Sequence, residues 1–347
     1  MPENTKRSRI TCNIPLDADG LHQGDLLLRY SDNTQPLGYY PIPICVLANA
    51  KGPTAMLIGG VHGDEFEGPT ALMRLVQTIN VEDINGRIIV LPTLNKPAID
   101  ASTRISPLDQ VNMNRAFPGD ENGGPTHMLA HFIEQVLMPL SDIVIDLHTG
   151  GKSSIFTPCT LVSRTADQQL FKDSLNLAGA FGLPLIWLLG EFNDDRSVNS
   201  AALRNNIPMI ATELGGGGGN DPVQIDIAEK GICRCLSSVG ILDNRSSDDN
   251  CLDDRSTMTA IPRNVEIRSQ SQNLYAPVSG LFDRQFNAGD EVKKGQFGGF
   301  VYPSDQPWAA PIELRFPETG LVLAHGNRGN VIRGDMLAMV ANDVQGL

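Results

Sequence analysis

Between residues 42 and 242, short apolar runs alternate with stretches of helical periodicity, and this alternation constrains the fold more than any other feature of the chain. In the stretch 68–79, for example, Leu72, Leu75 and Ile79 fall on one side of a helix. Such alternation is typical of a mixed, mainly parallel sheet with helices on both faces, so we predict an α/β fold. The expected strands are 41–50, 54–61, 86–95, 141–148, 184–190 and 207–218, and the expected helices are 68–79, 125–140, 166–182, 197–206 and 221–240.

The pattern changes after residue 242. Residues 243–256 are polar, acidic and without periodicity, and beyond them short strand-like runs are separated by Gly and Pro. The stretches 276–296 and 310–335 share an order of Pro, Gly-Leu and a Gly turn, as in the half-repeats of lipoyl-like barrel-sandwich folds, but the lysine of such carriers is absent. We therefore expect an N-terminal β-rich extension, an α/β domain, a linker and a small all-β domain that shapes access to a site, at residues 1–41, 42–242, 243–256 and 257–347.

The overall charge and the start of the chain limit the classes of partner. The net charge of −13 at neutral pH disfavours binding to nucleic acid or to an anionic membrane surface. No run is long and apolar enough to span a membrane, residues 1–17 lack the apolar core of a secretory signal, and the six cysteines match no zinc-finger spacing. We therefore expect a cytoplasmic protein without nucleic-acid or membrane partners. The sequence leaves the oligomeric state open, a homo-oligomer included.

The stretch GGVHGDEFEGP, residues 59–69, places a histidine and three carboxylates where a predicted strand ends and a helix begins. His62 and Glu65 are three residues apart, so the imidazole can lie in the turn and the carboxylate in the first helical turn. Zinc binds both types of ligand, and a catalytic zinc site commonly has three protein ligands and one open position. His148 ends the strand 141–148 and supplies the third ligand, because ligands gather at the carboxyl ends of strands in open α/β sheets.

Neighbouring residues support or compete with this site. Asp146 lies on the same face of the strand as His148 and is a candidate hydrogen-bond partner for an imidazole N–H. One histidine at a strand end is more often a hydrogen-bonding residue than a ligand, but three suitable side chains at the ends of two different strands favour a metal. His127 and His131 are a competing pair, four residues apart on a predicted helix. They lack the Glu of the metalloprotease motif and alternate with core positions, so we interpret them as structural.

Glu213 lies at the end of an apolar run, just before the five glycines 215–219. Partial desolvation raises the pKa of a carboxylate, and one that lies over the open coordination position of a metal can take a proton from water, so Glu213 is the candidate general base. The alternative is a capping or turn glutamate. The glycines favour either close backbone approach or a mobile rim.

The stretch 102–120 is too polar for a core element and contains two arginines and several asparagines. An Arg beside an Asn offers a fork of donors suited to a carboxylate, and a second Arg near a metal can stabilise an oxyanion. The candidates are Arg104, Asn112, Asn114 and Arg115. Because surface arginines are usually solvated, this stretch alone is weak evidence.

Four motifs, HGDE, NMNRAFPGD, DLHTGG and TELGGGG, occur in this order and together resemble the succinylglutamate desuccinylase/aspartoacylase family of zinc carboxypeptidase-like deacylases. Within that family the chain is most similar to the N-acetyl-diaminobutyrate deacetylase group. The resemblance covers residues 42–240 by motif, and the small β domain is also as in the family. It implies one zinc ion per chain. By motif position it implies zinc binding by His62, Glu65 and His148, proton transfer by Glu213, polarisation of the substrate carbonyl by Arg104, and binding of the substrate carboxylate by Asn114 and Arg115.

The resemblance implies an enzyme that hydrolyses the linear amide bond of a small N-acylated amino acid with metal-activated water. Glu213 would take the proton of the water and pass it to the leaving amine, while Arg104 and zinc hold the oxyanion. Some relatives contribute a late tyrosine, for which Tyr275 and Tyr302 are candidates. The acidic stretch 190–200 would favour a substrate with an extra amine. The alternatives are a zinc carboxypeptidase acting on short peptides and a metal-binding protein without catalysis.

Overall fold

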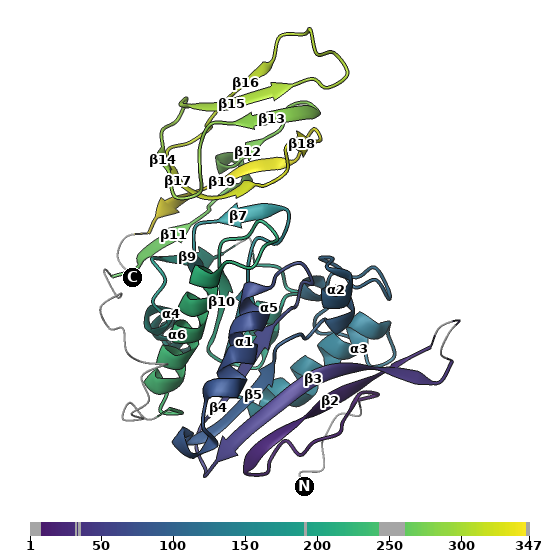
Figure 1. Cartoon of the computed structure of the whole chain (residues 1–347). Helices are drawn as coiled ribbons and strands as arrows, with labels where there is room; N and C mark the ends of the chain where they lie inside the picture. Colours follow the sequence, from purple (N-terminus) through teal and green to yellow (C-terminus); the bar gives the residue numbers. More distant parts are fainter. Residues whose placement is uncertain (1–7, 32, 34–35, 191–192, 243–260, 345–347) are drawn as a thin grey trace.

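The computed structural model describes residues 8–31, 33, 36–190, 193–242 and 261–344, and its largest element is a long mixed sheet (Figure 1). The centre of this sheet consists of four neighbouring parallel strands, in the order β5 (Gly86–Leu91), β4 (Thr54–Gly59), β6 (Ile143–His148) and β10 (Met209–Glu213). Every residue of β4 and β6 is buried. Strands become buried along their whole length where both faces of a parallel sheet are covered.

Helices cover both faces of the central strands. Successive side chains of a strand point to opposite faces, so each face has apolar side chains and forms its own hydrophobic core with the helices that cover it. In β4, Met56 belongs to the first core and Leu57 to the second. The predicted α/β fold with helices on both faces is therefore confirmed. Helices α3 (Pro125–Phe132) and α5 (Val198–Arg204) contribute to the first core, whereas α1 (Glu67–Thr78), α4 (Gln168–Phe181) and α6 (Pro222–Ser238) contribute to the second.

Capping residues in the sequence set the ends of some helices, but the sequence pattern does not reveal the π-helical and 3₁₀ segments inside another. The Asp167 side chain accepts hydrogen bonds from the first turn of α4, and Gly182 ends this helix in the left-handed conformation, with φ of 85°. The predicted helix 125–140 is helical but not uniform. After α3 it continues as a π-helix over Ile133–Leu137 and a 3₁₀ turn over Met138–Leu140.

An antiparallel hairpin extends the central sheet on the N-terminal side. It consists of β2 (Gly20–Tyr30) and β3 (Gly38–Asn49), with the short β1 (Thr11–Cys12) beside β2. Strand β3 pairs antiparallel with β5, so the hairpin and the central strands form one continuous sheet. The short helix α2 (Lys96–Ala101) follows β5.

Two short strands were not expected from the sequence. Strand β8 (Cys159–Ser163) inserts between β10, to which it is antiparallel, and β9 (Leu185–Leu189), to which it is parallel. Strand β7 (Ser154–Phe156) pairs with a strand of the C-terminal region. Both segments are short, and Ser, Thr and Pro interrupt their apolar pattern, so periodicity gives little signal for them.

Within residues 261–344, which the structure describes, the C-terminal region is all-β apart from a 3₁₀ turn at Gln270–Gln272, and it has its own hydrophobic core. Part of it continues the long sheet, because β11 (Arg263–Glu266) pairs parallel with β9. The next strands in the sheet are β19 (Met336–Asp343), β17 (Gly320–Gly326) and β14 (Glu291–Val292), and β12 (Leu274–Tyr275) also pairs with β19. The other part is a separate antiparallel sheet of β16 (Ile312–Arg315), β15 (Phe297–Tyr302), β13 (Gly280–Arg284) and β18 (Asn330–Val331). The expected linker 243–256 lies outside the described residues.

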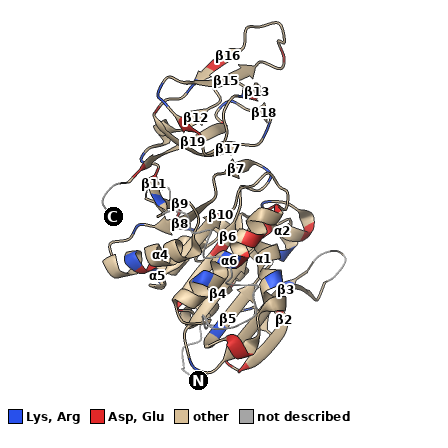
Figure 2. Cartoon of the chain, turned by 60° about the vertical axis from the view of Figure 1, so that its left-hand side comes forward, with Lys and Arg blue, Asp and Glu red and all other residues tan. Residues whose placement is uncertain are grey.

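Acidic and basic residues are interspersed along the helices and strands in the view of Figure 2. Among the described residues, no helix combines the length and the apolar character that crossing a membrane requires.

Candidate active site

The three predicted zinc ligands come from the carboxyl ends of neighbouring parallel strands. His62 and Glu65 lie in the turn between β4 and α1, and His148 is the last residue of β6. The turn packs closely against α2, because a Cβ on Gly63 would lie 1.9 Å from the carbonyl carbon of Ala98. A glycine between the two candidate ligands therefore allows this turn to lie against α2.

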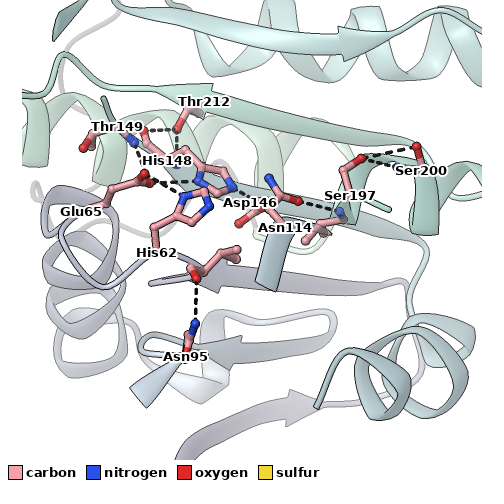
Figure 3. A network of polar contacts seen from close by, with 12 residues as sticks. His62, Glu65, Asn95, Asn114, Asp146, His148, Thr149, Ser197, Ser200 and Thr212 are labelled. Carbon is pink, nitrogen blue, oxygen red and sulfur yellow. Dashed lines mark hydrogen bonds and ion pairs between the residues drawn. The ribbon is translucent and has the colours of Figure 1, made fainter. Parts of the chain in front are cut away.

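The side chains of His62, Glu65 and His148 meet in a buried cluster (Figure 3). Nδ1 of His62 lies 2.8 Å from Oε1 of Glu65, and Nδ1 of His148 lies 2.9 Å from Oε2 of the same carboxylate. One ligand atom from each residue lies within 4.8 Å of the other two. Within the described part of the chain, these three side chains are the one group of His, Cys, Asp or Glu that meets this criterion for a metal ion.

The far nitrogen of each imidazole faces an oxygen acceptor. Nε2 of His148 lies 2.8 Å from Oδ2 of Asp146, the partner expected from the sequence. Nε2 of His62 lies 3.1 Å from Oδ1 of Asn112, and the same oxygen accepts the backbone N–H of Asn114 at 2.9 Å. Because a backbone N–H can only donate, the Asn112 side-chain atom that it contacts must be the oxygen. Both Nε2 atoms therefore act as donors, which leaves the Nδ1 lone pairs directed at Glu65.

This donor set fits a divalent metal ion. Two imidazole lone pairs face a carboxylate that can only accept, at 2.8 and 2.9 Å, so a proton or a cation must lie between them. Two nitrogens and one carboxylate oxygen are ligands that zinc prefers, and a catalytic zinc site has this number of protein ligands. The hydrogen bonds that the imidazoles donate to Asp146 and Asn112 are of the kind that orients imidazole ligands in metalloenzymes.

The environment perturbs the ionisation of all three side chains. Burial lowers the pKa of His62, and the neighbouring Glu65 carboxylate opposes this only in part. Burial also disfavours a charged His148, but Asp146 and Glu65 outweigh that effect and raise its pKa well above the usual value. Glu65 is desolvated as well, yet the two imidazoles hold its pKa below the usual value. The cluster is thus built around a buried carboxylate that stays charged.

Glu213 is the last residue of β10, in register with His148 on the adjacent strand β6. Directly paired residues of neighbouring strands point to the same face of a sheet, so the Glu213 side chain lies beside His148. Its Oε2 atom is buried and has no hydrogen-bond partner among the described residues. Burial, reinforced by the nearby charge of Glu65, raises the pKa of Glu213 from 4.5 to about 8. A carboxylate of this kind can exchange protons near neutral pH.

The loops that follow β6 and β10 are fastened to each other. All of Gly215–Gly218 have positive φ, and a Cβ on Gly216 would lie 2.2 Å from the carbonyl oxygen of Ser154. The Gly217 N–H donates to the carbonyl oxygens of Gly151 and Ser154 at 2.7 and 3.1 Å. Of the two interpretations of the glycine run, the structure supports close backbone approach.

The arginines and asparagines of the stretch 102–120 lie at different positions around the cluster. Arg104 reaches the cluster, because its Nη1 donates to Oε1 of Glu65 at 3.2 Å. Oδ1 of Asn114 accepts the backbone N–H of Val198 at 2.9 Å, so its amide N–H groups are the ones left for a ligand. Arg115 is paired with Asp194, with 2.9 Å between Nε and Oδ2, and its side chain is partly exposed.

The acidic stretch 190–200 meets Arg115 through Asp194, whose carboxylate also binds Arg196. Asp194 is therefore neutralised by two guanidinium groups and offers little attraction to an amine. Residues 191 and 192 of this stretch lie outside the described residues.

The remaining candidates are separate from the cluster. Nδ1 of His127 lies 3.2 Å from the carbonyl oxygen of Ala116, in keeping with the structural interpretation of this residue. Tyr302 belongs to β15 in the separate antiparallel sheet, and the Tyr275 hydroxyl accepts a hydrogen bond from Asn273 at 3.4 Å. Neither tyrosine has a hydrogen bond to a residue of the cluster within the described chain.

Two contacts with the cluster were not anticipated from the sequence. The backbone N–H of Thr149 donates to Oε2 of Glu65 at 3.1 Å, and the amide of Asn112 supports His62. A backbone donor leaves no trace in the sequence. In the sequence, Asn112 is only one of several polar residues in its stretch. Its contact with His62, 50 residues away, forms only because the fold brings the two residues together.

Known proteins provide an independent comparison with this geometry. A curated relative, the N-alpha-acetyl-L-2,4-diaminobutyric acid deacetylase of Halomonas elongata, is 34% identical over 346 residues, which is 100% of this chain and 98% of the relative. A succinylglutamate desuccinylase/aspartoacylase from Rhodobacter sphaeroides has a similar structure, with a TM-score of 0.89 and 36% identity over 97% of this chain and 100% of that chain.

The product-bound structure of the ectoine utilization protein EutE (DoeB) from Ruegeria pomeroyi gives a TM-score of 0.90 with 33% identity, over 97% of this chain and 100% of that chain. Residues 51–239 match the succinylglutamate desuccinylase/aspartoacylase catalytic domain. These residues contain the buried cluster, Glu213 and the stretch that carries Arg104, Asn114 and Arg115. The chain is thus a member of the succinylglutamate desuccinylase/aspartoacylase family.

Proposed function

We propose that this protein is a zinc-dependent hydrolase that cleaves the amide bond of a small N-acylated amino acid. The observation that carries the proposal is the convergence of two imidazole Nδ1 atoms and a buried carboxylate, each imidazole being oriented by an oxygen acceptor on its other nitrogen. Membership in the family and the full-length similarity to a deacetylase support the same reaction class.

His62, Glu65 and His148 would hold one zinc ion, which when bound supplies a Lewis acid and lowers the pKa of water. Glu213 takes a proton from the attacking water and delivers it to the nitrogen of the leaving amine. The water oxygen bonds to the acyl carbon and the C–N bond breaks, which gives a carboxylic acid and a free amine.

The neighbouring donors position the substrate and its developing charge. Arg104 already reaches Glu65 and is close enough to the cluster to donate to the carbonyl oxygen as it becomes an oxyanion. The amide N–H groups of Asn114 and the guanidinium of Arg115 bind the substrate carboxylate. The motif positions, the contact of Arg104 with Glu65 and the amide N–H groups that Asn114 leaves free among the described residues support these roles.

For the substrate we propose an N-acetylated diamino acid such as Nα-acetyl-2,4-diaminobutyrate, on the basis of the full-length similarity to the Halomonas elongata deacetylase. Asp194 is bound by two arginines, so the structure does not assign recognition of the second amine to that residue.

Metal analysis combined with a substrate panel tests this function. The purified protein is analysed for bound metal and assayed, with zinc added, on Nα-acetyl-diaminobutyrate, N-acetyl-aspartate, N-succinyl-glutamate and dipeptides. We expect about one zinc per chain and release of free amine from an acetylated amino acid. Hydrolysis of dipeptides alone would indicate a carboxypeptidase, and bound zinc without any hydrolysis would indicate a binding protein.

A further inference from the structure

The Asp194 carboxylate and the Asn114 carbonyl oxygen hold the Arg115 guanidinium through two different nitrogens. Nε lies 2.9 Å from Oδ2 of Asp194, and Nη1 donates to the carbonyl oxygen of Asn114 at 2.6 Å. Across the described residues, no hydrogen bond or ion pair involves Nη2. A guanidinium binds a carboxylate best through two N–H groups in one plane, so the groups that set this plane decide how a ligand is bound.

Asp194 is itself held firmly. Its Oδ1 accepts the backbone N–H of Arg196 at 2.9 Å and Nε of the same residue at 3.0 Å, and its Oδ2 accepts Nη2 of Arg196 at 2.9 Å. The hydrogen bonds from Arg196, together with the charge of Arg115, lower the pKa of Asp194 to about 2. Asp194 is therefore an anion at any working pH. The three side chains together keep one net positive charge, so Asp194 can orient Arg115 without cancelling its attraction for a carboxylate.

The segment that carries Asp194 is also joined to the turn that carries Arg115. The Val198 N–H donates to Oδ1 of Asn114 at 2.9 Å, and the Phe117 N–H donates to the carbonyl oxygen of Arg196 at 3.1 Å. The same turn begins at Asn112, whose side chain contacts the candidate zinc ligand His62. The position of Arg115 relative to the cluster is thus set from both ends of the turn.

We propose that Asp194 is a positioning residue that holds the Arg115 guanidinium in the orientation that binds the substrate carboxylate. The inference rests on the proposed function, in which Arg115 takes that carboxylate. It assigns Asp194 to substrate selectivity and not to the chemical step, because its contacts run to Arg115 and Arg196 and not to the His62–Glu65–His148 cluster.

The Asp194→Asn variant tests the proposal, because asparagine keeps the size of the side chain and removes its charge. Kinetics are measured on an N-acetyl amino acid and on its carboxamide, which lacks the carboxylate. We expect the KM for the acid to rise about tenfold, because the substrate carboxylate loses the equivalent of one charge-assisted contact. The kcat should change less than about threefold. The KM for the carboxamide and the zinc content should stay at wild-type values.

A double-mutant cycle asks whether Asp194 acts through Arg115. In an Arg115→Ala background, Asp194→Asn should have no further effect on the KM for the acid. Asp226→Asn is the matched control, because Asp226 forms an exposed pair with Arg74 on a different helix. Its kinetics should equal those of the wild type.

Three results would overturn the proposal. Equal losses on the acid and the carboxamide would show a structural role for Asp194, and a lower KM for the acid would show that Asp194 competes with substrate for Arg115. A full effect in the Arg115→Ala background would show that Asp194 acts elsewhere. If the wild type hydrolyses no acylated amino acid, the proposed function fails instead. Calorimetric binding of 2,4-diaminobutyrate then still tests Asp194, with about tenfold weaker binding expected for Asp194→Asn.

Discussion

At the scale of single residues, Glu213 combines a raised pKa with a carboxylate oxygen that lacks a partner. Its Oε2 atom is buried without a partner among the described residues, whereas the ligands of the cluster are each held by several contacts. An unpaired carboxylate in such a place costs stability, so we interpret it as retained for proton transfer.

Replacing Glu213 by Gln should separate metal binding from turnover. Glu213 is not a donor of the cluster, so the variant should retain its zinc, while loss of the proton acceptor should lower kcat by a factor of about 10²–10⁴. Metal analysis and steady-state kinetics on the same preparation provide the test. Glu318→Gln, at an exposed pair with Lys294, is the matched control and should be fully active. Loss of zinc from Glu213→Gln would place this residue among the ligands.

The raised pKa of Glu213 also predicts a dependence of stability on pH in the protein without metal. The pKa is about 8 in the folded state against an ordinary 4.5, so the folded state holds the proton more tightly than the unfolded chain. This contribution to stability is complete below pH 4.5 and is lost as the pH rises to about 8. Relative to Glu213→Gln, the free energy of unfolding should fall by up to about 1.4 kcal/mol per pH unit in that window.

Urea unfolding of both proteins in the presence of a chelator, at pH 5 and pH 8, measures this difference. Zinc adds positive charge beside Glu213 and lowers its pKa, so added metal should reduce the difference between wild type and variant. Parallel pH profiles of the two metal-free proteins would contradict the assignment of the raised pKa to Glu213.

At the scale of elements, the loops after β6 and β10 fix the site as much as the strands do. Strand ends bring His148 and Glu213 side by side, but the glycine run allows the following loop to lie against residues 150–154. Two positions in this run offer a direct comparison, because one is crowded and the other is open.

Gly216→Ala should impair the site, whereas Gly219→Ala should not. A Cβ at Gly216, with φ of 139°, would lie 2.2 Å from the carbonyl oxygen of Ser154, whereas a Cβ at Gly219 would meet nothing within 4 Å. We expect Gly216→Ala to lose more than about 1 kcal/mol of stability and most of its activity, because the loop that follows Glu213 must move. Denaturant unfolding and kinetics check both variants. Wild-type activity in Gly216→Ala would show that this loop does not position Glu213.

At the scale of the whole molecule, zinc should link the segments that supply its ligands. His62 and Glu65 lie more than 80 residues before His148, and a ligand that binds only the folded state stabilises the whole fold. Saturation at about 1,000 times the dissociation constant should add about 4 kcal/mol. Calorimetric melting with zinc and with a chelator tests this. The His62→Ala variant should show a much smaller difference between the two conditions, and a midpoint independent of metal in the wild type would contradict a site of this kind.

The central fold and the grouping of His62, Glu65 and His148 could be predicted from the sequence because both depend on local patterns. Apolar runs of strand type alternate with stretches of helical periodicity, which indicates parallel strands. Parallel strands place their carboxyl ends at one edge of the sheet, and this predicts that His62 and His148 lie together. The short strands β7 and β8 were missed because their pairing is decided by distant partners. The domain limits, the linker and the cytoplasmic location stay predictions.

Sequence alone determined the type of fold, the three donor side chains and the candidate base, because hydrophobic period and side-chain chemistry are properties of neighbouring residues. Only the tertiary structure decided which nitrogen of His148 faces Glu65, that Asn112 supports His62 and that Asp194 holds Arg115. These contacts join residues separated by 50, 83 and 79 positions. Their geometry depends on how packed elements bring distant segments together, and no local pattern encodes that.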